Sequence, residues 1–282
     1  MYSRPADFNE ALRLLAEPDA RVLAGCTDIF PTAGERILTG RHVDVTALPA
    51  LRGIRIEGDS IRIGGAVTWS DLAKAELPPA FNALRGAARE IGGIQIQNRG
   101  TLAGNLCNGS PAADGVPPLL VLNTEVELVS VRGQRRVPLV EFIIGNRRTA
   151  LRPGEILTAV FVPQPAPTAR SSFVKLGARR YLVISIVMVA VLLDVVEGRV
   201  REARVAAGAC SAAAKRLPEV ERSLIGAPAH TGLGDLVEGG HLAELSPIDD
   251  LRGSAEYRRD AALTLVRRAI EHCLNGEAEG VV

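Results

Sequence analysis

The chain has 282 residues, 47% of them hydrophobic and 23% charged, and its 33 Lys and Arg against 32 Asp and Glu give a net charge of +1. One domain takes roughly 100–200 residues, so this length is enough for two. A balanced charge without a basic block argues against a nucleic-acid-binding protein, which must neutralise phosphates. The longest apolar run, residues 186–193, is too short for a membrane span, and the N-terminus shows no signal-peptide pattern.

The cysteines are too widely spaced to form a CxxC pair; they are Cys26, Cys107, Cys210 and Cys273. This excludes a disulfide-dense scaffold and any recognisable zinc or iron–sulfur ligand set. Isolated thiols are typical of a reducing compartment, so we expect a cytoplasmic protein. The motifs GxxxxGK[ST], HExxH and GxSxG are also absent, which leaves a P-loop enzyme, a metalloprotease or a serine hydrolase without support.

The first half of the chain predicts a mixture of strands and helices. A helix is expected over residues 7–17, because Phe8, Leu12 and Leu15 fall on one face after Asp7, a suitable N-cap. The elements that follow are strands at 21–24, 42–46, 51–56 and 59–65, helices at 70–77 and 81–91, and strands at 125–131, 135–138 and 155–162. Residues 92–118 are rich in Gly, Asn, Ser and Pro and are expected to form a long loop without regular structure.

Three prolines within residues 163–168 mark a linker, which divides the chain into residues 1–166 and 167–282. The second part predicts long strands at 173–176, 184–195 and 201–209, followed by helices at 218–224 and 254–274. In the last helix, Arg258 is expected in solvent with its neighbouring arginines. Long strands followed by helices, without βαβ alternation, favour the α+β class.

The first candidate binding segment is VLAGCTDI, residues 22–29. A strand that ends in small residues exposes successive backbone N–H groups, and such groups bind phosphate oxygens without any lysine. An ordinary strand-to-loop turn is the alternative for this segment taken alone.

The second candidate segment is IGGIQIQNRGTLAGNLCNGSPAAD, residues 91–114. Its polar side chains offer many neutral donors and acceptors and little charge; they include Asn98, Thr101, Asn105, Asn108, Ser110 and Asp114. Long polar segments of this kind are usually functional. The composition suits a large ligand that carries both a phosphate and hydroxyl groups.

This second segment closely resembles the signature of the FAD-binding (medium) subunits of the molybdenum hydroxylases, and AGCTDI at 24–29 resembles the first flavin loop of that family. The resemblance continues through residues 173–191 and 254–270. It implies an FAD-binding domain of the vanillyl-alcohol-oxidase (PCMH) type. It also implies a small C-terminal α/β domain with a three-stranded antiparallel sheet.

The resemblance also implies site residues. Two bends would hold the FAD pyrophosphate through backbone N–H groups, namely Leu23, Ala24, Gly25, Cys26, Thr27, Asp28 and Ile29 in the first, and Gly100, Thr101, Ala103, Gly104 and Asn105 in the second. Thr101 would add its hydroxyl, and Asp114, with Ser110 nearby, would bind ribityl or ribose hydroxyls. Ile91 and the backbone near Leu157 would contact the cofactor, and Lys175 would place a cation close to the flavin ring.

Two residues depart from the family pattern. Cys26 and Ala103 stand where the family commonly has glycine. If position 103 requires a positive φ, its alanine costs about 1 kcal/mol.

The function implied by the resemblance is electron transfer. A small partner subunit with [2Fe–2S] clusters would deliver single electrons, and a large molybdopterin-binding partner would oxidise the substrate, in a dimer of heterotrimers. FAD would collect two electrons for an external acceptor. A stand-alone FAD-dependent oxidase or dehydrogenase of the same fold is the alternative, and a scaffold subunit without cofactor is a third hypothesis.

Overall fold

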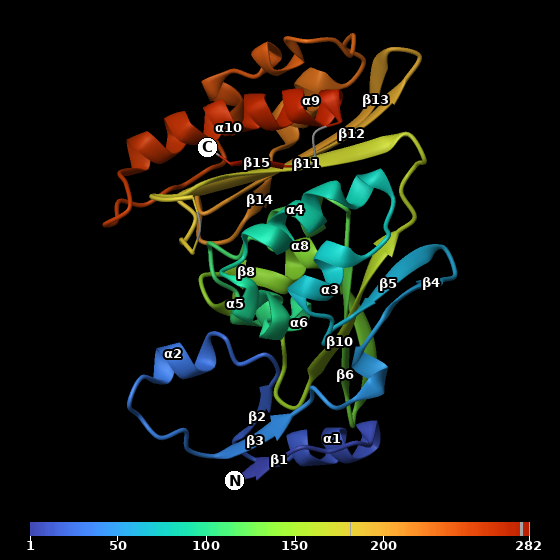
Figure 1. Ribbon diagram of the computed structural model, residues 1–282, viewed down its shortest axis with the longest axis vertical. Helices are drawn as coiled ribbons and strands as arrows, with labels where there is room; N and C mark the ends of the chain where they lie inside the picture. The colour runs from blue at the N-terminus through green and yellow to red at the C-terminus, as the bar shows by residue number, and fades with distance from the viewer. Residues whose placement is uncertain (181, 277–278, 282) are drawn as a thin grey trace.

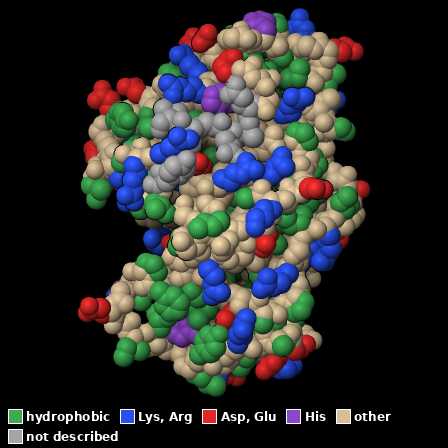
Figure 2. All heavy atoms as spheres, viewed as in Figure 1, with side chains coloured by type: hydrophobic (Ala, Val, Ile, Leu, Met, Phe, Trp, Pro, Cys, Tyr) green, Lys and Arg blue, Asp and Glu red, His purple; other side chains and the backbone are tan. Residues whose placement is uncertain are grey.

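A computed structural model describes residues 1–180, 182–276 and 279–281. The molecule is elongated, with the N-terminal lobe at one end, a sheet with helices in the middle and a second large sheet at the other end (Figure 1). Figure 2 shows basic and acidic side chains interspersed over one face, and an indented outline where the N-terminal lobe meets the middle of the molecule.

The N-terminal lobe is a small parallel sheet of order β1-β3-β2 with two helices. Its elements are β1 (Tyr2–Ser3), α1 (Phe8–Leu15), β2 (Ala20–Leu23), α2 (Ile29–Ala33) and β3 (Arg41–Asp44), followed by the 3-10 turn η1 (Pro49–Leu51). The Asp7 side chain accepts a hydrogen bond from the Glu10 amide at the start of α1, which confirms the predicted N-cap. Ala11, Leu12 and Leu15 then pack on Val43 and Val45 of β3 and its exit.

The middle of the molecule is an antiparallel sheet of order β4-β5-β10-β6-β7. Its strands are β4 (Ile54–Glu57), β5 (Ser60–Gly64), β6 (Glu125–Ser130), β7 (Gly133–Pro138) and β10 (Ile156–Pro163). The helical elements beside it are α3 (Trp69–Lys74), η2 (Pro79–Phe81), α4 (Asn82–Glu90), α5 (Ile94–Arg99), α6 (Leu102–Asn108), α7 (Val116–Val121) and α8 (Leu139–Phe142), with a small hairpin of β8 (Ile143–Gly145) and β9 (Arg148–Thr149). The expectation of an irregular loop over residues 92–118 is therefore wrong, because α5, α6 and the start of α7 lie within it.

The C-terminal sheet has the order β14-β13-β12-β11-β15. Its elements are β11 (Ala169–Leu176), β12 (Val187–Val196), β13 (Arg199–Gly208), β14 (Lys215–Arg216), α9 (Pro218–Leu224), η3 (Leu233–Leu236), η4 (Gly239–Leu242), α10 (Ala255–Asn275) and β15 (Glu279–Val281). The three long antiparallel strands predicted from the sequence form the centre of the sheet. The three-stranded count is wrong, since short β14 and β15 extend the two edges.

Arg258 on α10 corrects a second expectation. Its side chain is buried, and its guanidinium donates to the carbonyls of Ile186 and Ala209 and pairs with Asp250. Its two terminal nitrogens find acceptors, whereas its Nε has none among the described residues, and Arg258 joins α10 to the sheet instead of facing solvent.

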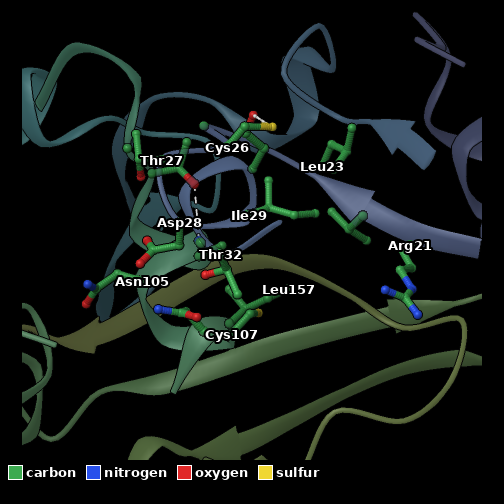
Figure 3. Close-up of a pocket in the computed structure, with 18 of the residues that line it drawn as sticks. Arg21, Leu23, Cys26, Thr27, Asp28, Ile29, Thr32, Asn105, Cys107 and Leu157 are labelled. Carbon is green, nitrogen blue, oxygen red and sulfur yellow. Dashed lines mark hydrogen bonds between the residues drawn. The ribbon is translucent and has the colours of Figure 1, made fainter. Parts of the chain in front are cut away.

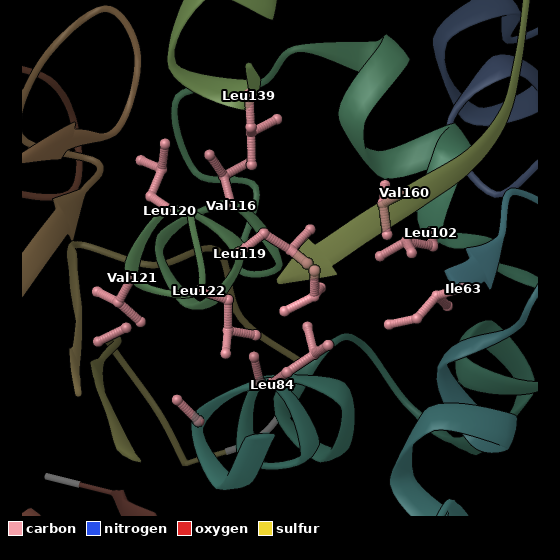
Figure 4. Packing of buried hydrophobic residues seen from close by; sticks show 14 of the residues in the cluster. Ile63, Leu84, Leu102, Val116, Leu119, Leu120, Val121, Leu122, Leu139 and Val160 are labelled. Carbon is pink, nitrogen blue, oxygen red and sulfur yellow. The ribbon is translucent and has the colours of Figure 1, made fainter. Parts of the chain in front are cut away.

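The C-terminal sheet is covered on both faces, by α9 and α10 on one side and by α4 and α7 on the other. Residues from β11 to β13 therefore belong to the same apolar cluster as the middle of the molecule; they are Ala169, Phe173, Met188, Ala190, Leu192 and Ala206. Figure 4 shows part of this cluster, in which Leu119 of α7 and Leu122 at the end of α7 lie against Leu84 of α4. The two parts of the chain therefore share this cluster, and the C-terminal sheet has a second cluster of its own with α9 and α10.

No helix among the described residues is both long enough and apolar enough to cross a lipid bilayer.

Because the two parts of the chain share a hydrophobic cluster, we predict that a destabilising substitution in the C-terminal sheet also lowers the stability of the first part. Leu192→Ala on β12 is expected to lower the free energy of unfolding by about 2–5 kcal/mol. Trp69, the single tryptophan, is buried in the same cluster and reports this change by its fluorescence in a urea titration. Leu251→Ala is the control, because Leu251 is 94% exposed. An unchanged Trp69 midpoint in Leu192→Ala would contradict a shared core.

Candidate functional site

A cavity of about 1260 Å³ lies between the N-terminal lobe and the helices of the middle region. The first bend, residues 23–29, and the second bend, residues 100–105, both contribute to its wall. Figure 3 shows Thr27, Asp28 and Ile29 of the first bend across the cavity from Cys107 and Leu157. All the residues predicted for the cofactor site line this cavity except Lys175.

The two bends touch at Gly25. A Cβ built on Gly25 would lie 1.9 Å from the Arg99 carbonyl oxygen and 2.9 Å from the Gly100 Cα. Any larger residue would push the two backbones apart. Glycine is needed here for close approach, and its own φ is not in the left-handed region.

The first bend leaves four consecutive backbone amides without an acceptor. Among the residues that the structure describes, none accepts a hydrogen bond from the N–H groups of Gly25, Cys26, Thr27 and Asp28. Buried or partly buried amides are normally paired, so a run of unpaired ones at a cavity wall is suited to an external anionic acceptor.

The second bend differs from the sequence expectation, because most of its amides are already used. Leu102 N–H donates to the Val67 carbonyl at 3.0 Å, and Ala103 N–H donates to the Gly65 carbonyl at 3.0 Å. Gly104 N–H donates to the Thr101 hydroxyl oxygen at 3.1 Å, which caps α6. The second bend therefore contributes shape and the Thr101 hydroxyl proton more than free amides.

The backbone strain lies at Cys26 and not at Ala103. Ala103 is a helical residue of α6, so its replacement of glycine carries no φ penalty. Cys26 has a φ of 61°, in the left-handed region, where a residue with a Cβ costs on the order of 1 kcal/mol relative to glycine.

Asp114 lines the cavity from behind α6 and is 7% exposed. One of its oxygens accepts from the Lys175 ammonium at 2.7 Å, and the other accepts from the Ser185 hydroxyl at 2.5 Å. Burial raises the pKa of Asp114, and the Lys175 charge and the two hydrogen bonds act against that rise.

Lys175 lies behind Asp114 and is absent from the residues that form the cavity wall. Its ammonium also donates to the Glu90 carbonyl at 3.3 Å, and the residue is 3% exposed. A cation already paired with a carboxylate presents little net charge to a ligand. The structure thus places Lys175 against Asp114, and its expected position close to the flavin ring stays a prediction.

Two further features of the wall bear on a cofactor. The Asn105 side-chain oxygen is buried and has no hydrogen-bond partner among the described residues, so it is available to a donor group of a ligand. Burial raises the pKa of the Cys107 thiol to about 12, and it also raises the pKa of the Cys26 thiol. Both cysteines are therefore protonated thiols near neutral pH and poor nucleophiles.

The described residues hold no group of three His, Cys, Asp or Glu side chains that could bind a metal ion.

This wall fits a dinucleotide. The volume exceeds the roughly 300–1,000 Å³ of ordinary small-molecule sites, as an extended ligand requires. Unpaired amides suit a diphosphate, and the Asn105 oxygen and the Asp114 carboxylate suit amide N–H or hydroxyl donors. The sequence predicted free amides in the second bend, but the amides of Leu102 and Ala103 are paired. Their acceptors, the carbonyls of Val67 and Gly65, lie far away in the chain, so the sequence could not show these pairs.

Comparison with protein families gives two matches in chain order. Residues 1–165 match the model described as the FAD binding domain in molybdopterin dehydrogenase. The chain belongs to this family. Residues 172–273 match the CO dehydrogenase flavoprotein C-terminal domain. This FAD-binding chain is therefore an oxidoreductase subunit, as the resemblance in its sequence implied.

Individual relatives agree with the family assignment. The xanthine dehydrogenase FAD-binding subunit of Escherichia coli is 33% identical over 278 residues, which cover 97% of this chain and 95% of the relative. The carbon monoxide dehydrogenase medium chain of Afipia carboxidovorans is 31% identical, over 96% of this chain and 95% of its own. A crystal structure of the Cu,Mo-CO dehydrogenase superposes with a TM-score of 0.91 at 30% identity, covering 98% of this chain and 97% of the other.

The contact between the bends gives a direct prediction. Gly25→Ala is expected to reduce the FAD retained on purification by about tenfold or more, because its Cβ must displace the Arg99 carbonyl. The ratio of visible flavin absorbance to protein absorbance measures this occupancy. Gly239→Ala is the matched control, since nothing lies within 4 Å of its added Cβ and its φ is not positive. Equal occupancy in the two variants would show that the bends need not touch.

Proposed function

We propose that this chain holds FAD in the cavity between the two bends and passes electrons from [2Fe–2S] clusters of a small partner subunit to an external acceptor. The observation that carries the proposal is the run of four unpaired amides at residues 25–28 on the wall of a dinucleotide-sized cavity. Bound flavin supplies the conversion between one-electron and two-electron steps.

The first bend would hold the diphosphate. Amides of Gly25, Cys26, Thr27 and Asp28 donate to its oxygens, and their partial positive charges offset the two negative charges without a lysine. The Thr101 hydroxyl accepts from Gly104 N–H and keeps its own proton to donate to an oxygen of the ligand. Gly100 and Gly104 both line the cavity; a side chain on Gly100 would meet Trp69, and one on Gly104 would meet the Thr101 hydroxyl.

The opposite part of the wall would orient the rest of the cofactor. Asp114 and Ser110 bind ribityl or ribose hydroxyls, and the Asn105 oxygen accepts from a donor of the ligand. Ile91 and Leu157 give apolar and backbone contact. This division is what a PCMH-type domain requires, and the parallel N-terminal lobe set against the antiparallel middle sheet supports that assignment.

We further propose that the chain assembles with a large molybdopterin-binding subunit and a small iron–sulfur subunit, as a dimer of heterotrimers in the cytoplasm. Relatives named medium subunit or medium chain support a three-part complex; one is the nicotine 6-hydroxylase medium subunit of Paenarthrobacter nicotinovorans, 32% identical over 95% of both chains. Substrate oxidation would belong to the large partner, as the names of relatives from multi-subunit dehydrogenases support.

We propose the boundary between the two structural domains at residues 166 and 167. The family matches support it, because they leave only residues 166–171 between them. Residues of both domains form one of the hydrophobic clusters. We therefore expect that neither domain folds stably without the other.

The function predicts how flavin leaves the protein. The as-isolated chain is expected to show flavin absorbance, and acid precipitation should release all of it into the supernatant, because the Cys107 and Cys26 thiols are protonated and do not form a covalent link. Yellow colour that stays with the precipitate would favour the stand-alone oxidase. A colourless protein that does not take up added FAD would contradict the proposal.

A second prediction concerns Thr101 and the glycine beside it. A Cβ on Gly104 would lie 2.9 Å from the Thr101 hydroxyl oxygen, so Gly104→Val displaces this group and is expected to abolish FAD retention. The circular-dichroism spectrum should keep its strand and helix content. Full flavin occupancy in Gly104→Val would exclude the second bend from the site.

A further inference from the structure

Another cavity, of about 590 Å³, lies where the end of α10 packs on the C-terminal sheet. Its wall is formed by the start of β11, the end of β12, residues 229–231 and residues 273–275, with Pro79 of η2 from the first domain. The volume falls within the roughly 300–1,000 Å³ that small-molecule sites occupy. This cavity and the one between the two bends have no wall residue in common, so the two are separate sites.

Hydrogen bonds between elements hold the wall of this cavity in place. The Cys273 thiol donates to the Arg170 carbonyl at 3.2 Å, which ties the end of α10 to the start of β11. On the other side, the Ala229 amide donates to the Gly198 carbonyl at 2.8 Å, in the turn between β12 and β13. The cavity is therefore set by the fold of the domain.

The floor of the cavity is apolar and is formed by Leu193 and Val195 of β12 together with Cys273 and Leu274 of α10. These residues belong to the hydrophobic cluster of the C-terminal sheet or pack against it. Burial raises the pKa of the Cys273 thiol to about 12, so the thiol adds no charge to the floor. A ligand with an apolar body would bury hydrophobic surface here.

The rim of the cavity is polar and is formed by the exposed side chains of Arg170, Thr231 and Asn275. Among the described residues, none accepts a hydrogen bond from the Arg170 guanidinium or forms an ion pair with it. A Cβ built on Gly276 would lie 3.2 Å from its Nη1, so the guanidinium lies beside the C-terminal end of α10, which attracts a cation. The helix end orients the guanidinium without using up its five donors.

Carboxylates close to this wall have other partners. Asp194, which lies between two floor residues of β12, pairs with Arg201. Glu271 of α10 accepts from two backbone amides within residues 232–234, at 3.2 and 2.8 Å. No Asp or Glu lines the described part of the wall. The charge of Arg170 is thus open to an anion from outside the chain.

We propose that this cavity is a second ligand site, which takes a small organic carboxylate with an apolar body. The planar guanidinium of Arg170 matches the two oxygens of a carboxylate, and Thr231 and Asn275 donate to the same group. The apolar body lies on Leu193 and Val195. One arginine neutralises a single negative charge, which favours a carboxylate over a doubly charged phosphate. The proposal does not depend on the function of the flavin cavity.

The test measures the binding of probe carboxylates to the full chain by isothermal titration calorimetry, in excess FAD so that the larger cavity is occupied. Hexanoate should bind more tightly than acetate, by about fourfold for each methylene that enters the floor. Benzoate should bind at least tenfold more tightly than benzamide, which has the same shape without the charge.

Substitutions at the rim locate the probe. Arg170→Met should weaken the binding of benzoate by about tenfold or more, and Arg170→Lys should restore part of the affinity as a cation without the planar fork. Arg268→Met is the matched control, because Arg268 is exposed on α10 and does not line the cavity. The thermal stability of each variant without probe separates loss of folding from loss of binding.

Three results would overturn the proposal. Equal benzoate affinity in Arg170→Met and Arg268→Met would place the probe away from Arg170. Equal affinity for acetate and hexanoate would show that the apolar floor takes no part. The absence of binding by every probe at millimolar concentration would show that the cavity is not a carboxylate site.

Discussion

The site depends on the close contact between two stretches of backbone that carry no side chain where they meet. Gly25 lies against the Arg99 carbonyl so tightly that a single methyl group would not fit. This contact brings the strand exit after β2 to the start of α6 and leaves four amides of the first bend without protein acceptors. Unpaired amides at a cavity wall are suited to an external acceptor, and in the function we propose this acceptor is the FAD diphosphate.

The C-terminal domain contributes residues 182–184 to the cavity wall, although both bends belong to the first part of the chain. Its sheet packs on α4 and α7, so the elements that support the cavity share a core with β11, β12 and β13. Lys175 and Ser185 extend this contact to Asp114 at the cavity wall. Packing and a buried ion pair therefore connect the two domains at the place where the cofactor would bind.

The sequence predicted what depends on local pattern. Helix α9 has the predicted bounds, and the N-cap of α1 and the central strands of the C-terminal sheet were also foreseen. Residues 92–118 were misassigned because α5, α6 and α7 are only six or seven residues long, too short to show a helical period among so many glycines and asparagines. Arg258 was misplaced because its burial depends on partners that the helical pattern does not show, the Ile186 carbonyl far away in the chain and Asp250 just before α10. The expected position of Lys175 beside a flavin ring stays a prediction, and the structure adds its pair with Asp114. Ala103 was expected to cost free energy if its position required a positive φ. The positive φ is at Cys26 instead, because the fold sets the backbone angle at each position, whichever residue the family commonly has there.

A crystal structure of this chain with FAD tests the central claim most directly. The account predicts that the diphosphate oxygens accept hydrogen bonds from the amides of Gly25, Cys26, Thr27 and Asp28 at about 2.7–3.2 Å, with Gly25 still in contact with Arg99. A structure in which FAD is bound while its diphosphate lies away from these four amides, or in which they are paired with protein carbonyls, would contradict it.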